Sequence, residues 1–342
     1  MNLDGWMPVR VAWRGSEPRV EWTPMGAQRL LDPFFEQTVQ RQMAQPFGTL
    51  DRRETTVEEM TAWTDAHAGA PLQGIIFHIS RCGSTLIGRQ LAALERNIVA
   101  QEPAPMDDVV RVGERLPGLT RAMHVRWLRA MAAALGQPRN GESAFYLKTD
   151  PWHIHSFDLF REAFPKTPWI FLYRDPVEVM VSQARIPGSW TVPGLVDPAL
   201  LGMAREDWVP PHLDTYQARS LAKMCWAGLR VVQQEGGGLL VNYAELPEAM
   251  YGRLLGHFGL REEDVPAMRE AAQQNAKSPA MRFVKDADAK QAEASERLRA
   301  VAAEHLMEVY AQLESERLAW METARRDGPG GASTIDGEAL AR

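Results

Sequence analysis

The stretch that decides the fold is residues 74–88, which read GIIFHISRCGSTLIG. Its first part, residues 74–79, is a short apolar run of the kind found in buried parallel strands. Apolar residues then follow at helical spacing, at Leu86, Ile87, Leu91 and Leu94. The stretch therefore predicts a strand, a tight turn and a helix that begins near Ser84 or Thr85.

The turn between this strand and this helix has the composition of an anion-binding loop. Backbone N–H groups at a helix start carry partial positive charge and bind phosphate well. Gly83 lets the backbone approach an anion closely, Ser84 and Thr85 add hydroxyl donors, and Arg81 adds a charged one. The ATPase motif GxxxxGK[ST], whose Ser/Thr holds magnesium, does not occur. The sequence predicts a phosphate loop that needs no metal, and an ordinary strand–turn–helix with a serine cap stays open as the alternative.

A second strand-to-helix junction lies at residues 173–182, which read YRDPVEVMVS. Pro176 suits a first helical turn. Arg174 and Ser182 are eight residues apart, or roughly two helical turns. Ligands of such sheets bind beyond the carboxyl ends of the strands, so both side chains are expected to face one anion.

Other apolar runs, at residues 145–148, 169–173 and 239–243, alternate with helical patterns. This alternation predicts an α/β fold with a central, mostly parallel sheet flanked by helices. Residues 7–23 predict a β-hairpin, and residues 34–43 and 51–67 predict helices.

These patterns divide the chain into four regions. We expect an N-terminal accessory region, an α/β domain, a long helix rich in Ala, Glu, Arg and Leu, and a disordered tail. The respective ranges are 1–70, 71–285, 286–326 and 327–342. Residues 187–211 carry Pro and Gly without periodicity, so they predict either a lid over a substrate or an inert surface loop.

Composition argues against several classes of partner. The chain has 342 residues and a formal charge of −6, which disfavours nucleic acid and anionic membranes. No apolar run approaches the roughly 20 residues of a membrane span, and no signal peptide is evident. The two cysteines, Cys82 and Cys225, fit a reducing cytoplasm as free thiols. The 8 histidines show neither HExxH nor H-x₃-H spacing, so no metal is expected.

Together the motifs resemble the sulfotransferases that use 3′-phosphoadenosine 5′-phosphosulfate (PAPS). Residues 80–86, SRCGSTL, are similar to the 5′-phosphosulfate loop of that family, and Arg174 with Ser182 is similar to its 3′-phosphate site. Residues 146–151, YLKTDP, lie where the family has a strand carrying a Lys, and residues 241–246, VNYAEL, resemble a late strand end. The resemblance covers residues 71–285.

The resemblance implies a P-loop NTPase-like sulfotransferase fold and a nucleotide-binding site. The implied reaction moves a sulfuryl group from PAPS to a hydroxyl or amine of a small-molecule or peptide acceptor. It releases 3′-phosphoadenosine 5′-phosphate (PAP) by in-line displacement and needs no metal. The acceptor and the oligomeric state are left open.

The resemblance also implies which residues form the site. The donor-binding residues are Arg81, Cys82, Gly83, Ser84, Thr85, Leu86, Arg174, Ser182 and, in a late basic segment, Lys277. Many members read K-T-H on the Lys strand, with His as the base, but this chain reads Lys148-Thr149-Asp150. Other members place a Glu where this chain has Glu102. We therefore expect Glu102 as the base, with Lys148 and Arg81 acting on the leaving group.

Two assignments keep alternatives. Asp150 and His153 are the reserve candidates for the base, and Asp107 with Asp108 either shapes the acceptor pocket or is a solvated pair. Two alternative functions also stay open. One is an ATP-dependent P-loop kinase or transferase, and the other is a catalytically silent binding protein on a sulfotransferase scaffold. Nucleotide preference distinguishes the first of these from a sulfotransferase.

Overall fold

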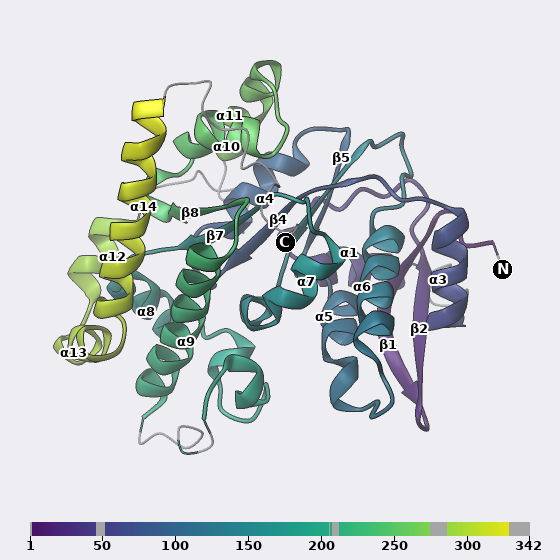
Figure 1. The fold of residues 1–342 in the computed structure, drawn as a ribbon, viewed down its shortest axis with the longest axis horizontal. Coiled ribbons are helices and arrows are strands. Elements are labelled where there is room, and N and C mark those ends of the chain that lie inside the picture. Colours follow the sequence, from purple (N-terminus) through teal and green to yellow (C-terminus); the bar gives the residue numbers. More distant parts are fainter. Residues whose placement is uncertain (1, 46–51, 205, 207–211, 274–285, 328–342) are drawn as a thin grey trace, which may run out of the picture.

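The structure is a computed structural model that describes residues 2–45, 52–204, 206, 212–273 and 286–327 (Figure 1). Its centre is a parallel sheet with the strand order β5-β6-β4-β7-β8, counted over the described residues. The strands are β4 (Leu72–His78), β5 (Asn97–Gln101), β6 (Ala144–Lys148), β7 (Trp169–Tyr173) and β8 (Gly238–Asn242). The predicted α/β fold with a central parallel sheet is thus confirmed. β5, which was not among the predicted strands, forms one edge of the sheet.

Helices connect and cover these strands. They are α4 (Ser84–Ala92), α5 (Ala104–Arg111), α6 (Arg121–Leu135), α7 (Phe157–Ala163), α8 (Pro176–Arg185), α9 (Leu213–Gln234), α10 (Arg253–His257) and α11 (Val265–Ala272). Helix α4 begins at Ser84, as residues 74–88 predict. Helix α8 begins at Pro176, whose fixed φ suits a first helical turn. Both helices thus start directly beyond a strand of the central sheet.

The predicted N-terminal hairpin is formed by β1 (Trp6–Arg14) and β2 (Glu17–Pro24). The helix predicted over residues 51–67 is wrong in its first part, because β3 (Arg53–Thr56) pairs antiparallel with β2. Thr55 of β3 is buried and accepts a hydrogen bond from Trp22 Nε1 at 3.0 Å, which explains a strand of polar residues. Helix α3 (Val57–Ala66) then starts with a capping box between Thr56 and Glu59.

The N-terminal sheet is joined to the central domain through α5. The backbone N–H of Val11 on β1 donates to Asp108 Oδ2 at 2.7 Å. Burial raises the pKa of Asp108 to about 6. Between these regions, Phe34 precedes α1 (Phe35–Met43) and faces the end of the central sheet.

The C-terminal segment is helical but is not one helix. It forms α12 (Ala287–Glu293), α13 (Glu296–His305) and α14 (Met307–Asp327). Ala294 is extended, and the Ser295 hydroxyl caps α13 by accepting from the Leu298 N–H at 3.2 Å, so the predicted helix over 286–326 is interrupted there. These helices lie beside α8, α9 and β8, away from the N-terminal sheet (Figure 1).

Two predicted features, Lys277 and the tail beyond residue 327, lie outside the described residues. Among the helices that are described, none is both long and apolar enough to cross a membrane.

Candidate active site

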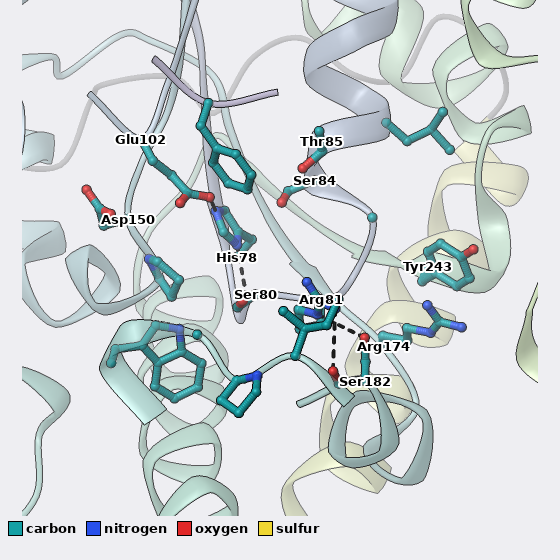
Figure 2. A pocket seen from close by; sticks show the side chains of 18 of the residues that line it. His78, Ser80, Arg81, Ser84, Thr85, Glu102, Asp150, Arg174, Ser182 and Tyr243 are labelled. Atoms are coloured by element: carbon teal, nitrogen blue, oxygen red, sulfur yellow. Dashed lines mark hydrogen bonds and ion pairs between the residues drawn. The ribbon is translucent and has the colours of Figure 1, made fainter. Parts of the chain in front are cut away.

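The carboxyl ends of the five parallel strands open into a cavity of about 720 Å³ (Figure 2). Each described strand of the central sheet contributes a lining residue at or just beyond its end; these are His78, Glu102, Asp150, Arg174 and Tyr243. This is where ligands of open parallel sheets bind. Glu102 and Asp150 lie at one end of the cavity and Arg174 and Tyr243 at the other, with Ser84 and Thr85 between them (Figure 2).

The loop between β4 and α4 has an unusual backbone. Ser80 and Arg81 have φ values of 66° and 54°, in the left-handed region that non-glycine residues rarely adopt. The Ser80 N–H donates to His78 Nδ1 at 2.9 Å and helps to hold this conformation. Strained backbone of this kind is concentrated at functional sites. Because the first N–H groups of a helix lack intrahelical partners, the start of α4 can bind an anion.

Gly83 is required at its position for two reasons. Its φ is +91°, and a Cβ there would lie 2.6 Å from Cδ2 of the Tyr243 ring. The same ring supports Arg174, whose guanidinium carbon lies 3.8 Å from the ring centroid. The loop glycine and the arginine at the end of β7 are therefore coupled through one tyrosine.

The residues predicted for the second anion site also lie together. Arg174 and Ser182 both line the cavity and are almost fully buried. Arg81 reaches across from the loop, and its Nε donates to Ser182 Oγ at 2.9 Å (Figure 2). Arg174 is held in place by Glu178, which accepts from its Nε at 2.6 Å. The residues predicted for the two phosphate groups thus lie in one continuous cavity.

At the other end of the cavity a carboxylate meets two basic side chains. Glu102 Oε1 lies 2.8 Å from Lys148 Nζ and 3.4 Å from His78 Nε2. Glu102 also has a left-handed φ of 52°, fixed by a hydrogen bond from its N–H to the Lys148 carbonyl oxygen at 2.8 Å. Because β5 and β6 are neighbours in the sheet, the predicted base and the predicted helper come together.

The charges in this group are well defined. Burial alone raises the pKa of Glu102, but Lys148 and His78 outweigh it and hold the pKa well below its usual range. Burial is also the main cause of the lowered pKa of His78. His78 Nδ1 accepts from Ser80, so the ring proton belongs on Nε2, 3.0 Å from the Thr149 carbonyl oxygen. Glu102 is therefore ionised, and His78 is neutral with no free basic nitrogen.

The two reserve candidates for the base, Asp150 and His153, are less suited than Glu102 to take up a proton. Asp150 lines the cavity, but burial, together with Asp107 and Glu102, raises its pKa well above the usual range. His153 is fully buried, and its Nε2 donates to Asp107 Oδ1 at 2.9 Å. Asp107 also accepts from Trp152 Nε1 at 2.7 Å, so it anchors the wall behind the cavity.

The predicted acidic pair at 107–108 therefore does not line the cavity, since Asp108 is bound to Val11. Asp107, Asp150 and His153 each have one atom that could bind a metal ion, and these three atoms lie within 4.8 Å of one another.

The remaining predicted donor residues fall into three groups. Gly83, Ser84, Thr85 and Leu86 line the cavity. Cys82 is buried and absent from the lining, and burial raises the pKa of its thiol to about 11, so it packs into the core. The placement of Lys277 is outside the described residues.

Several lining residues escaped the sequence analysis. Phe34 comes from the N-terminal region, and Lys148 Nζ lies 5.0 Å from its ring centroid. Trp190 comes from the segment predicted as a lid or an inert loop, whose residues 187–190 line the cavity. Asp286 and Lys290, four residues apart in the segment predicted as a long helix, also line it. Only the last pair had a readable signal, namely opposite charges at helical spacing.

Comparisons with known proteins give similarities in structure. No family model and no curated protein matches the sequence. The chain is similar to a sulfotransferase from Alicyclobacillus acidocaldarius, at 16% identity and a TM-score of 0.45 over 74% of this chain and 99% of that one. It is also similar to the sulfotransferase domain from the curacin biosynthetic pathway, at 12% identity and a TM-score of 0.41 over 69% of this chain and 98% of that one. A third similar structure is a sulfotransferase from Mycobacterium tuberculosis H37Rv, at 13% identity and a TM-score of 0.40 over 62% of this chain and 75% of that one. At these identities the likeness concerns the fold alone.

Proposed function

We propose that this protein is a sulfotransferase that moves a sulfuryl group from PAPS to a hydroxyl or amine of an acceptor and releases PAP. The observation that carries the proposal is that one cavity contains both candidate anion sites and an ionised carboxylate paired with a buried lysine. A nucleotide with phosphate groups on both its 3′ and 5′ positions fits two such sites, whereas a simple nucleoside triphosphate does not need the second. PAPS acts here as a substrate that supplies an activated sulfuryl group.

The residues present fit such a donor. The start of α4, with Ser84, Thr85 and Arg81, would bind the 5′-phosphosulfate end, because helix-start amides and hydroxyls suit anionic oxygens. Arg174 and Ser182 would bind the 3′-phosphate. We also propose a cytoplasmic location, which the free, buried thiols Cys82 and Cys225 fit.

In the transfer step, the bond between sulfur and the bridging oxygen of the donor breaks while a bond from sulfur to the acceptor oxygen or nitrogen forms. The leaving 5′-phosphate gains negative charge, which Arg81 and the loop amides can neutralise without reorganising, whereas Lys148 would have to turn toward it from its place beside Glu102. The acceptor proton passes to Glu102, which is ionised and therefore able to take it. When the Lys148 ammonium turns toward the leaving oxygen, Glu102 loses its closest cation and becomes more basic.

The acceptor would occupy the end of the cavity near Glu102. The cavity also has a group of apolar and aromatic lining residues, which are Phe34, Trp152, Ile186, Pro187 and Trp190. The cations Arg81 and Arg174 are grouped toward the donor end. The site therefore suits an uncharged hydroxyl or amine compound, or a side chain of a peptide, with an apolar body.

The test is a thermal-unfolding panel with PAP, 5′-AMP, ADP and ATP–Mg, each with and without EDTA. PAP at a hundredfold excess over its Kd should stabilise the fold by about 2.7 kcal/mol, and EDTA should make no difference. Stabilisation by ATP–Mg but not by PAP would refute the proposal and favour a kinase. If PAP binds but labelled PAPS is never turned over with any acceptor or with water, the protein is a binding scaffold.

A further inference from the structure

The arginine at the end of β7, Arg174, already forms an ion pair with a carboxylate of the protein itself, Asp286. Asp286 Oδ1 accepts from Arg174 Nη2 at 2.6 Å, and Asp286 Oδ2 lies 2.8 Å from Lys290 Nζ. All three residues line the cavity at the ends of the five strands. Arg174 and Lys290 are 4% and 5% exposed in their side chains, whereas Asp286 is 40% exposed. The two cations are thus fixed and buried, and the carboxylate between them is open to the cavity.

The charges around Asp286 are unbalanced toward the positive. Three cations, Arg81, Arg174 and Lys290, interact with this carboxylate. Among the described residues, Glu178 is the one other carboxylate that forms an ion pair with Arg174. Arg81 and Arg174, and likewise Lys290 and Arg174, repel each other. If Asp286 moved away, the three cations and Glu178 would leave a net charge of +2 facing the cavity. A phosphate dianion, with a charge of −2, would balance it.

Helix α12 does not depend on Asp286 for its position. Gln291 Nε2 donates to Asp175 Oδ1 at 2.9 Å, and Arg185 Nε donates to Glu293 Oε1 at 2.7 Å. Both contacts join α12 to the start and the end of α8. Asp286 immediately precedes α12, so its side chain can turn away while the helix stays docked.

We propose that Lys290 is a further phosphate-binding residue of this cavity, and that Asp286 is an internal counter-ion that stands in for the 3′-phosphate of the nucleotide and is displaced when the nucleotide binds. This rests on the proposed function, because it takes the ligand to be a 3′-phosphorylated nucleotide. The carboxylate offers Arg174 and Lys290 two oxygens, as a phosphate would. It keeps buried cations paired in the empty protein, and it lowers nucleotide affinity by the free energy of its own contacts.

The opposite reading, that Asp286 orients Arg174 and Lys290 for the ligand, makes the opposite prediction. A competing carboxylate weakens PAP binding, so its removal strengthens binding. An orienting carboxylate strengthens PAP binding, so its removal weakens binding. The sign of one change in Kd therefore decides between them.

The experiment is isothermal titration of PAP and 5′-AMP into the wild-type protein, Asp286→Asn and Lys290→Met. Hydrogen bonds to charged groups correspond to about a 10- to 150-fold change in Kd, and the partial exposure of Asp286 favours the lower end. Asp286→Asn should lower the Kd of PAP about tenfold and change that of 5′-AMP less than about twofold. Lys290→Met should raise the Kd of PAP by about tenfold or more, again with little effect on 5′-AMP.

Glu293→Gln is the matched control, because it removes another carboxylate–arginine pair between α12 and α8 and should leave both Kd values unchanged. Weaker PAP binding by Asp286→Asn, or an unchanged Kd, overturns the counter-ion proposal. Should Lys290→Met not fold, Asp286→Asn still decides by its sign. If the wild-type protein binds PAP no better than 5′-AMP, the donor assignment itself fails, and that result is separate from a failure of Asp286 alone.

Discussion

Replacing Glu102 with Gln should destabilise the free protein strongly, because it leaves a buried ammonium without its carboxylate. Lys148 is 0% exposed in its side chain, and Glu102 is 21% exposed and 2.8 Å away. Removing one partner of a buried ion pair costs about 3–5 kcal/mol. We expect Glu102→Gln to lower the free energy of unfolding by about 3 kcal/mol, the lower end of that range, because Gln keeps the size of the side chain and its oxygen can still accept a hydrogen bond.

The double variant Glu102→Gln/Lys148→Met separates the charge effect from packing. Replacing a buried ion pair by uncharged groups is often nearly neutral, so the double variant should recover most of the loss. The assay is urea unfolding followed by circular dichroism at pH 7.5. A loss below about 1 kcal/mol in the single variant, or a double variant that is no more stable than the single one, would show that the pair is not a buried charge pair.

The pH dependence follows from the lowered pKa of Glu102. A carboxyl whose native pKa is below its unfolded value of about 4.3 contributes stability above pH 4.3, and this is lost as the pH falls toward the native pKa. The difference between wild type and Glu102→Gln should therefore be constant from pH 5 to 8 and should narrow below about pH 4.3. A difference that narrows instead as the pH rises toward 8 would contradict the assignment of an ionised Glu102.

Three other changes test separate parts of the account. Arg174→Ala should weaken PAP about 10- to 150-fold and 5′-AMP hardly at all in titration calorimetry, whereas equal weakening would place Arg174 outside the 3′-phosphate site. Gly83→Ala should raise the Kd of PAP about tenfold or more, because its Cβ would displace the Tyr243 ring that supports Arg174, and an unchanged Kd would contradict that coupling. Asp108→Asn should flatten the stability curve between about pH 4 and 6: the native pKa of about 6 exceeds the unfolded value, so wild-type stability falls by up to about 3 kcal/mol as the pH rises through this window. Urea titrations of both proteins across that range measure this difference.

The sheet and the phosphate loop could be predicted because their signals are local. Residues 74–88 contain an apolar strand, a glycine that adopts a positive φ and a helix start within 15 residues, and the structure has each of them in place. The start of α8 at Pro176 is equally local. In the N-terminal region, β3 was missed because its residues are polar and its stability depends on Trp22, which is distant in sequence.

The assembled site was only partly predictable, because it depends on the strand order. Glu102 meets Lys148 only because β5 and β6 are neighbours, and sequence spacing does not determine that. His78 was overlooked since its role is to link the loop to Glu102 across the sheet. The contact of Asp286 with Arg174 spans 112 residues, so it too could only be found in the folded chain.

The most direct test of the central proposal is a crystal structure of the protein with PAP. We expect the 5′-phosphate on the backbone N–H groups at the start of α4, with Ser84 and Thr85, and the 3′-phosphate on Arg174 and Ser182. The Asp286 carboxylate should have left Arg174. A 3′-phosphate bound elsewhere, or a nucleotide that lies outside the cavity at the ends of the five strands, would contradict the account.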